Sequence, residues 1–227
     1  QYNITTRTIP DNQWRVLYRD GLANLKQSKL IYMTQSPATP EERAVLENKI
    51  AIIDVMMAYS YMILVDTFSN VPYTEALDIE AYPLPAYDDA QAIYKDLMVK
   101  LTAASDKLTD ADSFDDADLM YHGDAMKWKK FANSLRLRMA MNIADVDMGY
   151  ATAQATAAVT AGIMTSNAES ATLQYLPIQP NTNPLYLDLV ASGRTDFVPA
   201  DTFVNKLNAL ADPRRPIFFT DFPAGSG

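Results

Sequence analysis

The sequence predicts an all-α protein made of antiparallel helix pairs, with a loop-rich C-terminal part. The 227 residues include only seven glycines, and apolar side chains recur at three- and four-residue steps along most of the chain, which is typical of amphipathic helices. From about residue 163, Asn, Ser, Thr and Pro become frequent, as they do in loops. We therefore expect a single α-helical domain over 1–227, truncated relative to the whole protein, with a helical scaffold at about 11–162 and a loop-rich segment with a short helix at 163–227.

Two helices are predicted in the first third of the chain. The first covers about 11–33, where apolar side chains line one face. The second covers about 40–66 and starts with Thr39 as its cap, and Glu42 completes a capping box. Its part at 50–65 is apolar or aromatic except at two positions. This stretch is shorter than the about 20 apolar residues that cross a hydrocarbon core, so we expect a buried core helix.

Four more helices follow. Asp88 is the expected cap of the third, with a glutamine three residues later. The fourth is expected at 124–146, the alanine-rich fifth at 147–161 before a stop at Gly162, and the sixth at 199–211. Successive amphipathic helices with mostly modest loops favour antiparallel pairs stacked as in a solenoid. The sequence has no strict 34-residue period, so these are not regular tetratricopeptide repeats.

The composition excludes several classes of function. The chain has 28 acidic and 19 basic side chains and a formal charge of −9, which repels phosphate backbones and argues against nucleic acids and other anionic polymers as ligands. The chain has no cysteine, so disulfides, thiolate metal sites and cysteine nucleophiles are excluded. His122 is the single histidine. We expect no catalytic residue, no metal and no cofactor.

The charged clusters have ordinary structural interpretations. The acidic run at 110–118 is expected to be a solvated face or at most a loose cation site, because its spacing lacks the glycine-centred calcium loop. A glycosidase would need two carboxylates placed across a cleft. Asp124 is expected to cap the fourth helix, with His122 as a loop residue before it, although a general base at His122 is an alternative. The basic side chains of the fourth helix are expected to pair with nearby acids, with Arg138 partly buried.

Aromatic side chains are the best candidates for ligand binding. Thirteen tyrosines are present, and several aromatic residues fall in predicted loops: Phe68, Tyr73, Tyr82, Tyr87, Tyr175, Tyr186 and Phe197. Exposed rings can stack on the apolar faces of sugars while polar neighbours bond the hydroxyls. The ligand-binding candidates are Asn12, Trp14, Phe68, Tyr73 and Tyr82. The alternative is that these rings pin loops onto the helical core, and Trp14 is equally explained as a core anchor.

Three stretches read together resemble the SusD/RagB family of nutrient-binding outer-membrane lipoproteins of Bacteroidetes. They are 64–76 (LVDTFSNVPYTEA), 123–140 (GDAMKWKKFANSLRLRMA) and 212–214 (DPR), and the second is the most specific. Ser69 stands where the family usually has glycine, so we expect that turn to differ, with Asn70 in the left-handed conformation.

The resemblance implies an α-helical fold with tetratricopeptide-like helix pairs in a protein longer than this chain. It implies a protein that is not an enzyme, that binds oligosaccharides or peptides and that delivers them to a SusC-like TonB-dependent transporter. The expected location is the extracellular face of the outer membrane, with an N-terminal lipid anchor outside this chain as the only membrane attachment. The matching motifs are mainly architectural and therefore do not identify the ligand-binding residues.

Two other functions remain open on the residues alone. A helical scaffold could bind a protein partner through a groove. An all-α carbohydrate-active enzyme could use two acidic side chains. Turnover of oligosaccharides would identify the enzyme, and affinity for a protein partner without any saccharide binding would identify the scaffold.

Overall fold

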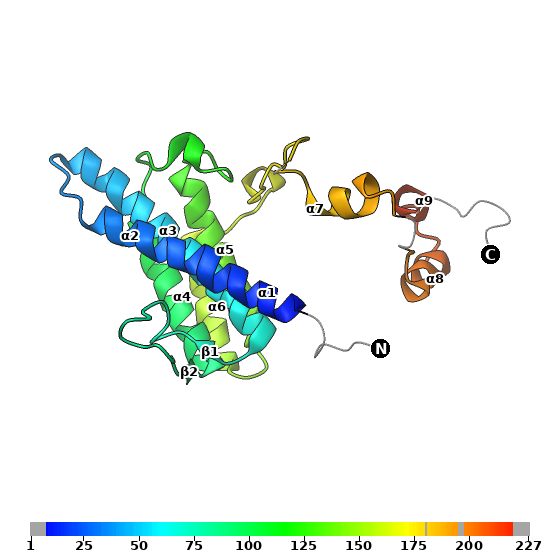
Figure 1. The fold of residues 1–227 in the computed structure, drawn as a ribbon, viewed down its shortest axis with the longest axis horizontal. Helices are drawn as coiled ribbons and strands as arrows, with labels where there is room; N and C mark the ends of the chain where they lie inside the picture. Colours follow the sequence, from blue (N-terminus) through cyan, green and yellow to red (C-terminus); the bar gives the residue numbers. More distant parts are fainter. Residues whose placement is uncertain (1–7, 180, 195–197, 220–227) are drawn as a thin grey trace. The chain divides into compact units, whose positions relative to one another are not determined.

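The computed structural model describes residues 8–179, 181–194 and 198–219, so Phe197 lies outside the described residues (Figure 1). The chain divides into two compact units, with the boundary between Leu173 and Gln174. Within the described residues the regular structure is helical except for two strands of two residues each, which confirms the all-α fold class. The single domain expected over 1–227 stays a prediction.

The first unit begins with one continuous helical rod, drawn in blue in Figure 1. It consists of α1 (Ile9–Arg15), the π-helical segment η2 (Val16–Leu22) and α2 (Ala23–Met33). The helix expected at 11–33 is therefore confirmed, but its wider middle turns were not predicted, because π-helical turns leave no periodic signature and often mark functional positions. Leu22 at the end of η2 is fully buried in the core.

Helix α3 (Pro40–Phe68) is the central element of this unit and packs against η2, α2, α4 and α5. Thr39 caps it as predicted, because the Glu42 N–H donates to Thr39 Oγ1 over 3.1 Å. The Glu42 carboxylate accepts from the Ala38 N–H at 2.7 Å and not from the cap itself. By length and composition α3 could cross a membrane, as many core helices could, and 56% of its most apolar window is buried inside the protein.

The turn after α3 differs from the expected one. Ser69 itself has a φ of 67°, where a left-handed conformation was expected at Asn70. The Asn70 side chain instead accepts a hydrogen bond of 3.0 Å from the Ala90 N–H, at the start of the next helix. The serine therefore takes the conformation that glycine adopts most easily, and the asparagine ties the two helix ends together.

Helix α4 (Ala90–Lys107) starts one residue later than predicted. Asp89 is its cap, with the Ala92 N–H donating to Asp89 Oδ1 over 2.9 Å. Asp88 belongs instead to strand β2 (Tyr87–Asp88), which pairs antiparallel with β1 (Val71–Pro72). A cap signal was present at both aspartates, and the long-range strand pairing decided between them.

Helices α5 (Ala125–Asn142) and α6 (Met148–Ala161) are the last long helices of the first unit, and each packs against the helix before it. Asp124 and Asp147 cap them, and Gly162 ends α6 with a φ of 97°. The cap at Asp124 and the stop at Gly162 were predicted, whereas the cap at Asp147 was not. Helix α5 ends four residues before the predicted 146, because residues 143–146 form a turn into α6.

The acidic loop before α5 is not wholly a solvated face. It contains the short helix η3 (Asp115–Ala117), and Asp118 after it is buried. The Asp118 carboxylate accepts hydrogen bonds from four N–H groups, which belong to Met120, Tyr121, Gly123 and Trp128. The prediction was wrong for this residue because a buried carboxylate can be satisfied by backbone donors that sequence spacing does not reveal. His122 is an exposed loop residue, as predicted.

The buried arginine of α5 is Arg136, not Arg138. Arg136 is 7% exposed and its Nε donates to Gln154 Oε1 on α6 over 2.7 Å, whereas Arg138 is exposed. Both positions border the apolar stripe, and the side on which α6 packs decided which one is buried. Lys130 pairs with Glu169 in the short helix η4 (Asn167–Glu169), as expected for the basic side chains of this helix, but Lys129 bonds a backbone carbonyl instead.

The second unit is made of short elements. They are α7 (Pro184–Tyr186), the π-helical η5 (Leu187–Ala191), α8 (Asp201–Ala209) and α9 (Arg215–Phe218). Helix α8 is the helix expected at 199–211. Arg214 after it donates to the Asp212 carboxylate at 2.6 Å.

Candidate functional site

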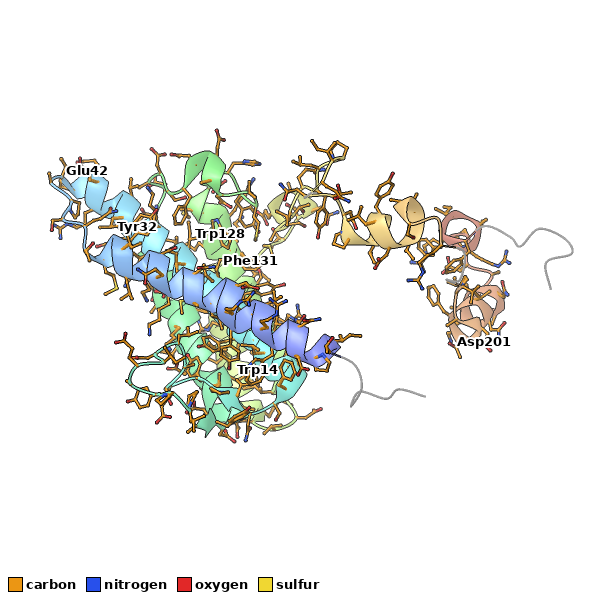
Figure 2. All side chains as sticks on the ribbon, in the orientation of Figure 1. Trp14, Tyr32, Glu42, Trp128, Phe131 and Asp201 are labelled. Atoms are coloured by element: carbon orange, nitrogen blue, oxygen red, sulfur yellow. The ribbon has the colours of Figure 1, made fainter. Side chains whose placement is uncertain are left out.

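The site begins with an aromatic contact between two segments far apart in the sequence. Trp14 on α1 lies 5.1 Å from Phe68 at the end of α3, ring centre to ring centre, and 4.8 Å from Tyr18. Figure 2 shows Trp14 beside the blue helix, on the side where β1 and β2 lie in Figure 1. Trp14 and Tyr18 are four residues apart and so share one face of the helix.

The strand pair adds a fourth ring. Pro72 of β1 pairs with Tyr87 of β2, and the Tyr87 ring stacks beside Trp14 at 6.0 Å with an interplanar angle of 28°. A cavity of about 390 Å³ opens next to these rings. We call it the aromatic hollow; it is lined by Trp14, Tyr18, Pro72, Ala76, Leu77, Leu84, Pro85 and Tyr87. Tyr87 is 64% exposed and Leu84 93%, so the outer wall is open to a ligand.

Two polar anchors hold the walls of the hollow in place. The Tyr18 hydroxyl donates to the Pro72 carbonyl oxygen at 2.6 Å, and burial raises the pKa of Tyr18 far above its usual range, so the hydroxyl remains a donor. The Asp88 carboxylate accepts from the backbone N–H groups of Tyr73 and Thr74, each at 2.9 Å. Burial opposes ionisation of Asp88, but these hydrogen bonds outweigh it and keep its pKa below the ordinary value.

The structure brings only two of the five predicted ligand residues, Trp14 and Phe68, into contact. Asn12 is exposed and lies two positions from Trp14, so it points to a different side of the helix. Tyr82 is 43% exposed in the 78–85 loop and has no ring partner among the described residues. The role of all five in ligand binding stays a prediction.

Tyr73 is bonded to α4 and does not line the aromatic hollow. Its hydroxyl donates to the Asp96 carboxylate and accepts from Lys100 Nζ at 2.6 Å. Its ring packs edge-on against Tyr61 at 4.7 Å. Burial, together with the hydrogen bond to Asp96, raises the pKa of Tyr73 far above its usual range. Tyr73 is therefore a fixed ring held by α4 and not a free one.

Sequence reasoning missed Tyr18 and gave Tyr87 no place in the site. The four-residue spacing from Trp14 could have found Tyr18, because it is a local signal. Tyr87 was noted as a loop aromatic, but its approach to Trp14 depends on a strand pair of only two residues, which carries no periodic pattern.

The aromatic hollow is suited to bind rather than to react. Its lining contains no carboxylate, histidine or lysine among the described residues, so it offers no acid and base pair of the kind that hydrolyses a glycosidic bond. Among all the residues that the structure describes, no group of three or more His, Cys, Asp or Glu side chains could hold a metal ion. Ring faces and apolar walls that meet at an open surface instead fit the C–H faces of sugar rings.

A family comparison decides what kind of protein this is. The family model SusD-like_2, described as "Starch-binding associating with outer membrane", matches residues 1–225. The chain belongs to the SusD-like family. This confirms the resemblance carried by the motifs at 64–76 and 123–140. No curated protein matches the chain.

Solved SusD-like structures share the fold. A chitin-binding protein is 28% identical with a TM-score of 0.74, over 91% of this chain and 42% of its own. A SusD homologue from Bacteroides fragilis is 25% identical with a TM-score of 0.70, over 87% and 41%. A SusD-like protein from Bacteroidetes, 22% identical with a TM-score of 0.71 over 95% and 42%, agrees in fold. The chain thus spans less than half the length of these relatives.

Proposed function

We propose that this SusD-like chain is part of a cell-surface protein that captures oligosaccharides through the aromatic hollow. Membership of a family described as starch-binding supports a saccharide ligand. The single observation that carries the proposal for this chain is the stack of Trp14 and Tyr87 beside an open cavity, because stacked rings with one exposed face are what a sugar ring needs.

The proposal includes the route of the ligand. The protein sits on the extracellular face of the outer membrane, held by an N-terminal lipid anchor outside this chain, and passes its ligand to a SusC-like TonB-dependent transporter without changing it chemically. The family description of association with the outer membrane supports this location. A peptide is the alternative ligand, since aromatic rings also bind peptide side chains.

The test is a binding measurement on Tyr87→Ala. Because Tyr87 is largely exposed, this change should leave the melting temperature close to that of the parent chain while it removes one stacking face. A glycan-array screen of the 227-residue chain would first supply a saccharide ligand. We expect Tyr87→Ala to weaken its binding about fivefold or more, as measured by calorimetry.

Two further variants make the test specific. Trp14→Ala should weaken binding at least as much, with a loss of stability because its ring also packs on the core. Tyr175→Ala is the matched control, since Tyr175 is an exposed ring outside the hollow. Equal binding by all three variants, or a silent array, would contradict the proposal. Turnover of the saccharide would show an enzyme instead.

A further inference from the structure

A second cavity adjoins the aromatic hollow. It has a volume of about 300 Å³ and shares Ala76 and Leu77 with the aromatic hollow as wall residues. We call it the lysine hollow, because its polar lining includes Lys26 and Lys29 from α2 and Lys100 from α4. The remaining walls are largely apolar. Apolar walls with a few converging polar groups are typical of small-molecule sites.

Two of the three lysines are neutralised by carboxylates. Lys29 forms an ion pair with Asp54 of α3. Lys100 Nζ lies 2.8 Å from the Asp96 carboxylate and also donates to the Tyr73 hydroxyl. These pairs hold the lysines and the tyrosine in fixed positions, so they present hydrogen-bonding groups to the cavity without adding net charge to it.

Lys26 is different, because its ammonium group has no carboxylate partner among the described residues. Its Nζ donates to the Leu77 carbonyl oxygen at 2.7 Å, in the wall that separates the two hollows. An ammonium group has three N–H donors, so two remain for another acceptor. The lysine hollow therefore carries one positive charge that the protein leaves uncompensated, in a chain with a formal charge of −9.

We propose that the lysine hollow binds a single carboxylate of an acidic sugar, such as a uronic or sialic acid residue, through Lys26. The inference rests on the proposed function, because the sugar residues next to the acidic one occupy the aromatic hollow. The charge of the whole chain repels polyanions, so the ligand has one anionic residue at this position and neutral residues beside it. A carboxylate paired with a partly buried ammonium forms a strong, charge-assisted hydrogen bond.

The experiment compares ligands that differ only in that charge. Sialyllactose and glucuronoxylotriose are each titrated into the 227-residue chain beside their methyl esters, with lactose and xylotriose as neutral cores. We expect the acid to bind about tenfold more tightly than its ester for at least one of the two pairs. High salt should reduce that difference, because it screens the charge.

Matched lysine variants assign the effect to one residue. Lys26→Gln should remove the preference for the acid and leave binding of the ester unchanged. Lys129→Gln is the control, because Lys129 Nζ also donates to a backbone carbonyl, that of Leu108 at 3.2 Å, and also has no carboxylate partner among the described residues. Lys129→Gln should keep the full preference.

The outcomes separate this inference from the proposed function. Equal binding of acid and ester, with both weakened by Tyr87→Ala, would overturn the charge site and leave saccharide capture standing. If Lys26→Gln weakened the binding of the acid and of the ester equally, Lys26 would only tether Leu77. That result would also overturn the charge site. Binding of no saccharide in any form would overturn both proposals.

Discussion

A single buried carboxylate organises the loop that leads into α5. Asp118 Oδ1 accepts from the N–H groups of Met120 and Tyr121 at 3.0 and 3.1 Å. Its Oδ2 accepts from the Gly123 N–H at 3.1 Å and from Trp128 Nε1 at 2.7 Å. Both oxygens therefore use two acceptor positions each, and the loop is held by charge-assisted hydrogen bonds inside the protein.

The variant Asp118→Asn tests this role. The asparagine keeps the size of the side chain but places an NH₂ group opposite two of the four donors, which leaves these donors without an acceptor. We expect the free energy of unfolding to fall by about 2–4 kcal/mol, measured by urea denaturation. Asp116→Asn, at an exposed position of the same loop, should change it by less than about 0.5 kcal/mol. Equal stability of the two variants would contradict the role.

At the scale of the element, α5 is held by aromatic packing. Trp128 is 3% exposed and meets the rings of Tyr121 and Phe131 edge-on at 5.3 and 5.6 Å. Phe131 is only half-buried and meets Tyr59 of α3 at 5.9 Å. Figure 2 labels both residues on the green helix. The two rings thus anchor α5 to α3 and to the Asp118 loop.

Truncation of these rings should separate their contributions. Trp128→Ala should cost about 3–5 kcal/mol, as expected for a buried tryptophan. Phe131→Ala should cost less, about 2–3 kcal/mol, because the phenylalanine ring is partly exposed. Met126→Ala, at an exposed position of α5, is the control. Chemical denaturation gives all three values, and unchanged melting of Trp128→Ala would contradict the packing of α5.

At the scale of the whole molecule, the surplus of acids makes stability depend on pH. Most acidic side chains are exposed. Glu169 has a structural role, because it holds the segment that follows α6 against α5. Its carboxylate pairs with Lys130 and accepts from the Thr165 N–H at 2.7 Å. The hydrogen bond from Lys130 and those from the backbone lower the pKa of Glu169 from 4.5 to about 2.

The sign of the pH effect follows from that shift. A carboxyl group whose pKa is lower in the folded state contributes stability above its unfolded pKa and loses it as the pH falls through the folded value. The contribution of Glu169 should therefore be complete above about pH 4.5 and decline toward pH 2. In Glu169→Gln this part of the acid dependence should be absent.

Tryptophan fluorescence is the measurement, because both tryptophans of the chain, Trp14 and Trp128, lie in the first unit. Denaturation curves of the parent chain and of Glu169→Gln are compared across this pH range. Glu47→Gln, at an exposed position without a partner among the described residues, is the control and should follow the parent chain. A parallel decline in Glu169→Gln and the parent would contradict the assignment.

Features that depend on near neighbours along the chain could be predicted from the amino-acid sequence. The helices follow from apolar side chains three and four residues apart, and the caps Thr39 and Asp124 follow from bonds that reach three residues along the chain. The family was also readable, because its motifs are contiguous. Of the candidate site, the sequence identified Trp14 and Phe68 as ring residues but could not say that they meet.

Features that depend on partners far away in the chain became visible only in the folded protein. Tyr18 reaches Pro72 over 54 positions, and Tyr87 reaches Trp14 through a strand pair too short to leave a pattern. Arg136 is buried instead of Arg138 because of the element that covers its side of the helix. The burial of Asp118 within an acidic run likewise depends on the elements packed around it. Periodicity shows that a face is apolar, but the packing partner sets the edges of that face and decides which charged residues at the edges are buried.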